Sequence, residues 1–225
     1  MPGRYTQTLN LEIMKKRFGF DSNGITLVPR YNIGPDQVAP VVMIEGRKVL
    51  QMMRWGLVPH WARDDAPHRR NINARAETLA EKPTFRDSFK NRRCLVLADG
   101  FYEWRGSERK NDKTPFRFTL KGGGPFAFAG LWDKWRRPDG STILSFAIIT
   151  TEPNELISPI HNRMPVILHQ EYEELWLDPS FKDTKELSSV LTPYLSDQMD
   201  FYEVSTVVNF PANDKPECIE PRKPG

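Results

Sequence analysis

Glu103 and His161 are the two side chains whose surroundings best suit proton transfer. Glu103 follows the apolar run over residues 94–98 and lies between aromatic side chains, so we expect its carboxyl group to be partly buried. Burial raises the pKa of a carboxyl group and suits it to proton exchange near neutral pH. His161 follows the apolar Ile160, and an imidazole titrates in the same range. A surface salt bridge for Glu103 and a hydrogen-bonded structural role for His161 are the alternative interpretations.

Asn73 and Arg75 alternate with apolar residues within the segment 71–78, which reads Asn-Ile-Asn-Ala-Arg-Ala-Glu-Thr. In a strand, residues two apart face the same side, so these two side chains would line one surface together. The amide of Asn73 offers a donor and an acceptor that could orient a hydroxyl or an aldehyde. The guanidinium of Arg75 has the planar fork that binds phosphate, and a salt bridge to Glu77 is the plainer alternative.

Arginines gather around these segments, and tryptophans lie between them. The arginines are Arg4, Arg54, Arg63, Arg69, Arg70, Arg75, Arg92 and Arg93, and the tryptophans are Trp55 and Trp61. Basic side chains beside aromatic rings that stack on bases are typical of proteins that bind single-stranded nucleic acid. The alternative is a solvated charged face with the tryptophans in the core, where we expect Trp55. The net charge of +3 is too small to indicate such a ligand by itself.

Composition limits the setting in which this chemistry could take place. The 225 residues, 39% of them hydrophobic, are enough for a single domain over residues 1–225 with a sizeable core. Cys94 opens an apolar run and predicts a buried thiol, whereas Cys218 lies in a polar C-terminal stretch. Because neither metal-binding spacing nor a disulfide framework is present, we expect a cytoplasmic protein with no metal and no cofactor. An apolar signal-peptide core and a run of about 18 apolar residues are both missing, which predicts no membrane span.

Helices are predicted at three places along the chain. Helical spacing favours a helix over residues 11–18, and Gly19 would serve as its C-terminal cap. Phe85 and Phe89 form an i, i+4 pair typical of a short helix. A third helix is expected over residues 187–194, disturbed by a proline near its end.

Strands are more numerous than helices and should form the main framework. Strand-like apolar runs cover residues 41–44, 49–53, 94–97, 116–119, 126–129, 143–150, 166–168 and 202–206. The turn at residues 122–125, Gly-Gly-Gly-Pro, indicates a hairpin between two of these runs. The pattern predicts an α+β fold, with a mostly antiparallel sheet or a partly closed barrel and peripheral helices.

Four segments of this chain resemble, in the same order, those of the SRAP family, which captures abasic sites in single-stranded DNA. The segments are residues 1–5, 71–78, 98–104 and 160–165. None is decisive alone, but the set is specific, and the resemblance extends from Arg4 into the C-terminal tail. It implies a compact, β-rich mixed fold and single-stranded DNA containing abasic sites as the partner. We expect a monomer that associates with the nucleoid when bound to DNA.

The resemblance also implies roles for individual residues. Asn73, Glu103 and His161 match the active site, where the glutamate handles protons at the captured sugar and the histidine assists ring opening. The residues that match DNA-binding positions are Arg4, Asn32, Trp61, Arg75 and Arg163. Among these, Arg75 would contact a phosphate and Trp61 would wedge against bases beside the lesion. Asn32 belongs to the segment 30–35, which we interpret mainly as a structural turn with Asn32 as a candidate contact.

Position 2 departs from the family pattern. The family begins Met-Cys-Gly-Arg and uses the cysteine as its nucleophile, whereas Pro2 stands in that place here. In the family, the terminal amine attacks the sugar aldehyde and the thiol then closes a stable thiazolidine ring. Proline has no thiol, so a free Pro2 amine would give a transient iminium that ends in strand cleavage or hydrolysis. If Met1 is retained, the Pro2 nitrogen is an amide and only non-covalent binding remains.

These observations leave three functions to compare. The first, which we favour, is an abasic-site processing protein altered at catalytic position Pro2. The second is a non-catalytic module that binds single-stranded DNA. The third is a peptidase, because the family carries that label from suspected cleavage of its own N-terminal bond. No serine, cysteine or threonine is paired with a histidine in a recognisable nucleophile pattern, which disfavours the third.

Overall fold

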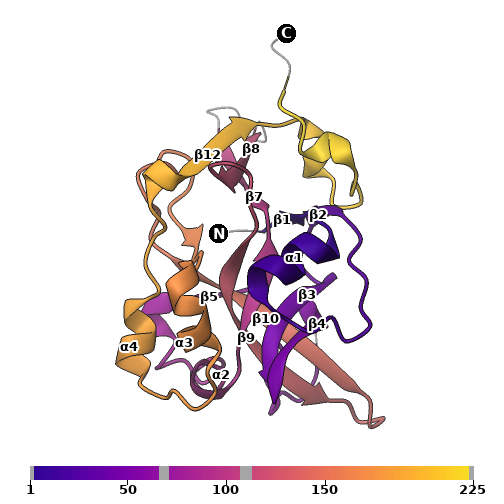
Figure 1. Ribbon diagram of the computed structural model, residues 1–225, viewed down its shortest axis with the longest axis vertical. Coiled ribbons are helices and arrows are strands. Elements are labelled where there is room, and N and C mark those ends of the chain that lie inside the picture. Colours follow the sequence, from indigo (N-terminus) through magenta and orange to yellow (C-terminus); the bar gives the residue numbers. More distant parts are fainter. Residues whose placement is uncertain (1–2, 66–70, 107–112, 223–225) are drawn as a thin grey trace.

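The computed structural model describes residues 3–65, 71–106 and 113–222 (Figure 1). The strands are β1 (Tyr5–Gln7), β2 (Arg30–Ile33), β3 (Val38–Glu45), β4 (Arg47–Trp55), β5 (Asn73–Arg75), β6 (Arg93–Ala98), β7 (Gly100–Gly106), β8 (Lys113–Leu120), β9 (Phe126–Arg136), β10 (Thr142–Thr151), β11 (Met164–Pro165) and β12 (Met199–Glu203). The helices are α1 (Leu11–Phe18), α2 (Arg86–Asn91), α3 (Glu173–Leu177) and α4 (Thr184–Ser189). In these described ranges, every helix is too short or too polar to cross a membrane.

Five strands close into a barrel. Their order is β10-β4-β3-β6-β9, and β9 pairs back onto β10. Neighbouring strands of the barrel are antiparallel, with the exception of β10 and β4, which are parallel. Further along, β10 also pairs in parallel with β5. Closure removes the free edges that an open sheet would expose. The predicted α+β class is therefore confirmed, and the barrel is closed rather than partly open.

A second sheet is antiparallel and has the order β12-β8-β7-β1-β2. It lies above the barrel in the view of Figure 1, close to the C-terminal segment. β1 is an interior strand of this sheet, because Tyr5 pairs with Ile33 on β2 and with Phe101 on β7. The first strand of the chain is thus held between two other strands.

Strand β6 is covered on both faces, and the sequence reflects this. Leu95 and Leu97 belong to an apolar cluster that includes α2 and α3 side chains such as Phe89. Cys94 and Val96 belong to a second cluster, shared with side chains from the second sheet. A continuous apolar run is the pattern expected of a strand buried on both faces.

The predicted helices are present, with one difference in length. α1 begins after Asn10, whose side chain accepts a hydrogen bond from the Ile13 amide at 3.0 Å, and it ends at Gly19 with a φ of +65°. This confirms the predicted left-handed glycine cap. α2 begins directly after Phe85. α4 ends at Ser189, so the second half of the expected segment 187–194 is not helical.

The hairpin expected at residues 122–125 is absent from the described sheets. Gly122 and Gly123 do adopt positive φ values of +80° and +68°, as a tight glycine turn requires. The strands on either side nevertheless lie in different sheets, since β8 pairs with β7 and β12 while β9 pairs with β6 and β10. The turn therefore carries the chain from the second sheet into the barrel.

Both cysteine thiols are buried. This confirms the expectation for Cys94. Cys218, in contrast to its polar surroundings in the sequence, packs with Tyr102, Val204 and Val208. A short 3-10 helix, Pro216–Cys218, turns its side chain inward.

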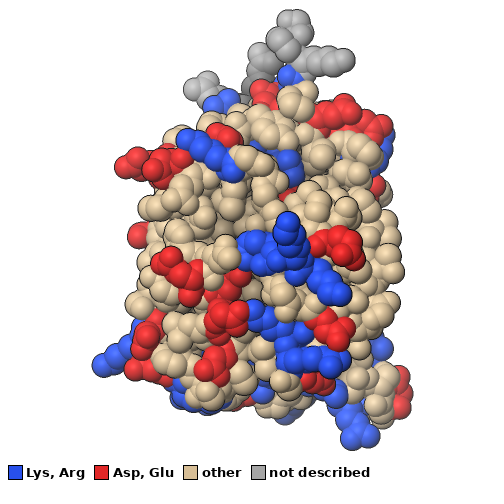
Figure 2. All heavy atoms as spheres, viewed as in Figure 1, with Lys and Arg blue, Asp and Glu red and all other residues tan. Residues whose placement is uncertain are grey.

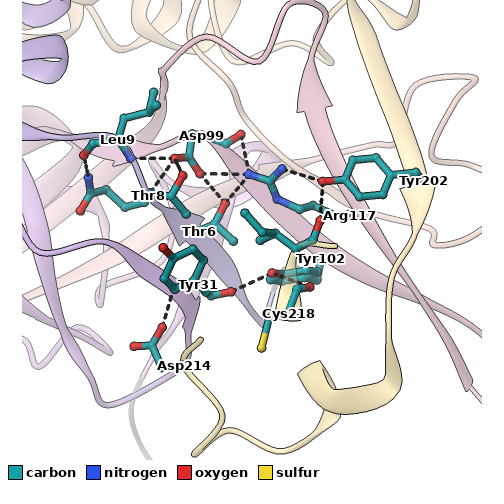
Figure 3. Close-up of polar contacts among 12 residues, drawn as sticks. Thr6, Thr8, Leu9, Tyr31, Asp99, Tyr102, Arg117, Tyr202, Asp214 and Cys218 are labelled. Atoms are coloured by element: carbon teal, nitrogen blue, oxygen red, sulfur yellow. Dashed lines mark hydrogen bonds and ion pairs between the residues drawn. The ribbon is translucent and has the colours of Figure 1, made fainter. Parts of the chain in front are cut away.

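Within the second sheet, the carboxylate of Asp99 links the N-terminal strand β1 to strand β8 (Figure 3). It is 3% exposed and accepts hydrogen bonds from the Thr6 hydroxyl, from the Thr8 amide and hydroxyl, and from the Leu9 amide. Arg117 on β8 donates to the same carboxylate at 3.2 Å. A buried carboxylate is stable only when paired and hydrogen-bonded, and here both conditions are met.

Arg117 extends this network across the sheet. Its Nη2 donates to the Thr6 hydroxyl at 3.0 Å, and its Nη1 donates to the Tyr202 hydroxyl on β12 at 2.9 Å. Figure 3 shows the guanidinium between Asp99 and Tyr202. The network therefore links β1, β8 and β12 and fixes the position of the chain just after residue 3.

Replacing Gly100 by alanine tests this network. A Cβ atom at Gly100 would lie 2.7 Å from Nε of Arg117 and 2.8 Å from its Cζ and Nη2 atoms. Arg117 cannot move aside without losing its bonds to Asp99 and Tyr202. We expect Gly100→Ala to lower the free energy of unfolding by about 1–3 kcal/mol, measured by urea denaturation.

Gly106→Ala is the matched control for this prediction. Gly106 lies on the same strand, and a Cβ there would meet no atom within 4 Å. Its free energy of unfolding should stay within about 0.5 kcal/mol of that of the unchanged protein. Equal losses in the two variants would show that the contact with Arg117 is not the cause.

Candidate active site

A cleft of about 620 Å³ contains the predicted proton-transfer residues. Its described lining consists of Gly3, Arg4, Pro35, Glu103, Trp104, Lys113, His161 and Asn209. These residues come from the chain start, the β2–β3 turn, strands β7 and β8, the loop before β11 and the 3-10 helix Thr206–Asn209. Gly3 is the residue bonded to Pro2, and Pro2 itself lies outside the described residues.

Glu103 lies on β7, opposite Phe116 of β8. It is 3% exposed, although its neighbours on the strand toward Gly106 become exposed. This burial raises the pKa of the Glu103 carboxyl to about 7. The carboxyl group is thus poised to give or take a proton near neutral pH, as the sequence predicts.

His161 faces Glu103 across the cleft, with its Nε2 4.0 Å from Glu103 Oε2. The Nδ1 atom of His161 accepts a hydrogen bond from the Arg163 amide at 3.0 Å. The same Nδ1 atom lies 3.2 Å from the Arg163 carbonyl oxygen, to which it would donate in the other tautomer. Burial lowers the pKa of His161, and the nearby charge of Lys113 lowers it further.

The pair therefore combines two groups whose pKa values shift in opposite directions, so that the carboxyl pKa lies above that of the imidazole. The Glu103 carboxyl becomes a weaker acid than usual, and the His161 imidazole becomes a weaker base. Near neutral pH, protonated carboxylic acid, carboxylate and neutral imidazole are all accessible in one cleft. This arrangement suits reactions that need both a general acid and a general base.

Arg4 contributes positive charge to the same cleft. Its Nη1 donates to Asn32 Oδ1 at 2.8 Å and to the Val208 carbonyl at 3.1 Å. Its guanidinium also lies over the Trp104 ring, 6.0 Å from the centroid. Within the described part of the chain these partners are all uncharged, so the charge of Arg4 remains available to an anion such as phosphate.

Asn32 is not a surface residue, which argues against the direct DNA contact considered from the sequence. Its side chain is fully buried, with 0% exposure. The amide nitrogen donates to the carbonyl oxygens of Val208, Phe210 and Asn213 at 2.8–3.2 Å. The expectation of a structural turn is the one that fits, because Asn32 organises the wall behind Arg4.

Asn73 and Arg75 lie on β5, beside the cleft rather than in its described lining. β5 pairs in parallel with β10, and Arg75 is opposite Thr150. Arg163 donates to the Thr150 carbonyl at 2.6 Å, which places it on the same edge, two residues from His161. Arg75, which is exposed, and Arg163 therefore both lie beside strand β10 at Thr150.

Glu77 has a different partner from the one considered from the sequence. Arg163 forms a bidentate pair with it, at 2.6 and 3.0 Å. The hydrogen bonds from Arg163 lower the pKa of Glu77. Arg75 is exposed beside this pair.

Trp61 lies in a separate hollow of about 640 Å³. Its side chain is 57% exposed and is accompanied by Leu57, Arg63 and Asn71 in the lining. Trp55 is fully buried, with its ring 5.2 Å from Tyr5. The expected division between an exposed Trp61 and a core Trp55 is therefore observed.

Several arginines expected near a nucleic-acid surface serve other purposes. Arg93 is 4% exposed and donates to main-chain carbonyls, including those of Phe89 and Trp176. Arg92 pairs with the buried Asp133 at 3.1 Å. Arg69 and Arg70 lie outside the described residues. Sequence reasoning could not separate these roles, because an arginine at a strand start looks the same whether it caps carbonyls or faces solvent.

Three cleft residues were not anticipated from the sequence. Trp104 is part of the quoted segment 98–104, and its Nε1 donates to Asn209 Oδ1 at 2.7 Å. Lys113 and Asn209 also line the cleft. Asn209 lies more than a hundred residues from Trp104 in the sequence, and no local pattern marks that pairing.

The basic side chains over α1 belong to a different surface (Figure 2). α1 carries Lys15, Lys16 and Arg17 in its last turn. Arg17 forms a bidentate pair with Glu173 of α3, at 2.7 and 2.9 Å. Acidic side chains lie among the basic ones on this face in Figure 2, so it lacks the single sign expected of a nucleic-acid surface.

Comparison with known proteins gives consistent matches. Residues 1–211 match the family described as SOS response associated peptidase (SRAP). The abasic site processing protein YoqW of Bacillus subtilis is 44% identical over 98% of this chain and 99% of its own length. The mouse abasic site processing protein HMCES is 34% identical over 86% of this chain and 65% of its own length. A crystal structure from Bacteroides thetaiotaomicron superimposes with a TM-score of 0.87 at 29% identity, covering 98% of this chain and 99% of that one.

The pKa of Glu103 predicts how stability responds to pH. Its folded-state pKa of about 7 lies above the ordinary value of 4.5, so the folded protein loses stability as the pH rises between these values. Glu103→Gln removes this loss. The variant should gain up to about 3 kcal/mol over the unchanged protein between pH 4.5 and pH 7, measured by urea denaturation.

Glu81→Gln is the control for this measurement, since Glu81 is an exposed carboxylate. It measures the effect of the same substitution at an exposed position. A difference from the unchanged protein that does not vary with pH for Glu103→Gln would mean that Glu103 is not titrating in this range.

Proposed function

The chain belongs to the SRAP family of SOS response-associated peptidases, and from this premise we propose that it processes abasic sites in single-stranded DNA. The names of its relatives support DNA with abasic sites as the substrate. The single-stranded substrate, the chemistry and the residues below are our proposal for this chain.

The observation that carries the proposal is the convergence of the chain start, Glu103 and His161 on one cleft. An abasic sugar in its open form is an aldehyde, and an amine is the natural nucleophile for an aldehyde. A free Pro2 would carry such an amine, and Pro2 is bonded to Gly3, which lines the same cleft as Glu103 and His161. Addition and dehydration at an aldehyde both need proton transfers, which these two side chains could perform.

Positive and aromatic side chains around the cleft support a single strand as the ligand. Arg4 and Arg75 could bind phosphates along the approach to the cleft. Arg163, the other arginine expected to contact DNA, is paired with Glu77 and would have to leave that pair to bind a phosphate. The exposed ring of Trp61 could stack on an unpaired base, which a duplex would not offer.

The proposed chemistry starts from Pro2 as a secondary amine. The nitrogen attacks the aldehyde carbon and gives up its proton, and the oxygen takes up a proton to become a hydroxyl. A second proton, donated by the acid form of Glu103, lets this oxygen leave as water and gives an iminium. Removal of a proton from the adjacent sugar carbon sends an electron pair toward the iminium and expels the 3′ phosphate. Water then hydrolyses the iminium and restores the amine. With no thiol to close a ring, the covalent state would be transient.

A non-catalytic binding function is the second candidate, and Met1 is the feature that favours it. If Met1 stays attached, the Pro2 nitrogen is a tertiary amide, which is not a nucleophile. The cleft would then hold the strand without any attack by Pro2. Action as a peptidase on other proteins has less support, because both cysteines are buried and neither is in the described lining of the cleft.

Reductive trapping distinguishes these candidates. We expect the purified protein, once Met1 is absent by intact mass spectrometry, to form an adduct with abasic single-stranded DNA only in the presence of borohydride. Pro2→Cys should form an adduct that persists without borohydride, because the thiol can close the ring. No adduct from a protein that lacks Met1 would leave binding as the function.

Glu103→Gln serves as the control for proton transfer in the same assay. We expect it to bind the strand as well as the unchanged protein does and to form the trapped adduct more slowly. An equal loss of binding and trapping would assign Glu103 a structural role.

Arg75→Ala tests the phosphate contact. Removing one phosphate contact should weaken binding to all single strands and reduce the slope of log affinity against log salt by about 1. Arg136→Ala is the matched control, because Arg136 is exposed near the tip of the β9–β10 hairpin. Equal salt slopes for Arg75→Ala and the unchanged protein would exclude the contact.

A further inference from the structure

Phe210 is an exposed aromatic residue at the edge of the cleft. Its side chain is 69% exposed, and it directly follows Asn209, which lines the cleft. An isolated exposed apolar side chain carries little information, because such residues are common on protein surfaces. The significance of Phe210 depends on how firmly its backbone is held and on what lies beside it.

The buried amide of Asn32 holds the backbone around Phe210. Asn32 Nδ2 donates to the carbonyl of Phe210 at 3.2 Å and to those of Val208 and Asn213 at 3.1 and 2.8 Å. The Asn213 amide also donates to the Phe210 carbonyl at 3.0 Å. The loop that presents Phe210 is therefore fixed by hydrogen bonds from inside the protein.

The same amide holds Arg4 on its other side. Arg4 Nη1 donates to Asn32 Oδ1 at 2.8 Å, while the nitrogen of that amide donates to the Phe210 carbonyl. The Asn32 side chain thus lies between the Arg4 guanidinium in the cleft and the backbone that carries the exposed Phe210 ring. Trp104, hydrogen-bonded to Asn209 and lying under Arg4, completes this wall.

We propose that this wall is a binding subsite for one nucleotide of a DNA strand whose abasic site occupies the cleft. Phe210 would stack on the base, and Arg4 would bind a phosphate of the same or the adjacent nucleotide. The subsite rests on the proposed function, since it requires a single strand in the cleft. It is distinct from the hollow at Trp61, whose described lining shares no residue with the cleft.

The construction of the wall favours this use. A phenylalanine ring brings a large contact area and few rotatable bonds, so little freedom is lost when a base stacks on it. Because the loop is already held by Asn32, binding would not have to order it. Asn32 thereby acts as a positioning residue, which explains a buried asparagine behind a surface that binds DNA.

The test uses a strand that cannot react. A fluorescent oligonucleotide with a tetrahydrofuran at its centre imitates the abasic site without an aldehyde, and a second tetrahydrofuran removes each neighbouring base in turn. We expect Phe210→Ala to weaken binding of the strand with all neighbouring bases by roughly 5- to 100-fold, measured by fluorescence anisotropy. For the strand that lacks the stacked base, the unchanged protein and Phe210→Ala should bind equally.

Two further variants make the result specific. Phe210→Tyr keeps a ring and should bind like the unchanged protein, and Leu195→Ala removes another side chain that is 50% exposed and should also leave binding unchanged. The salt slope of Phe210→Ala should match that of the unchanged protein, because stacking involves no counterion release. The subsite would be overturned if Phe210→Ala and the unchanged protein bound the strand with all its bases equally well, or if Phe210→Ala lost the same affinity whichever base is missing. Failure of the unchanged protein to bind any single strand would instead overturn the proposed function.

Discussion

The buried carboxylate of Asp99 fixes the position of the N-terminal strand in the fold. A carboxylate removed from water is costly unless hydrogen-bond donors surround it, and the donors here come from Thr6, Thr8 and Leu9 on one side and Arg117 on the other. Satisfying this one group therefore fixes β1 within the second sheet. Gly3 and Arg4, directly before β1, line the cleft as a consequence.

The cleft depends on this arrangement because its residues come from distant parts of the chain. Strand β7 carries Glu103, and the loop before β11 carries His161, whose ring accepts a hydrogen bond from the Arg163 amide. Asn209 belongs to the 3-10 helix Thr206–Asn209 near the C-terminus. None of these elements could create the site alone. The burial that changes the pKa of Glu103 is produced by all of them together, so acid–base character here is a property of the assembled fold.

Sequence patterns predicted the parts of this structure that depend on local chemistry. The apolar run at β6, the α1 helix with its Gly19 cap and the partly buried Glu103 all follow from neighbouring residues. Pairing between segments that are distant in the sequence could not be predicted from local patterns. The glycine turn at 122–125 indicates a change of direction but not which sheet the next strand joins, and Asn32 shows its role only once Arg4 and Phe210 lie on either side of it.

The position of β1 also has a consequence for the order in which the molecule assembles during synthesis. Arg4 leaves the ribosome among the first residues, yet its acceptor at Val208 is made more than two hundred residues later. β12, which pairs with β8 and accepts a bond from Arg117 through Tyr202, is also among the last elements made. Contacts this distant in sequence form slowly and late. A nascent or prematurely terminated chain would therefore hold its barrel strands without a complete cleft, which delays DNA binding until translation is finished.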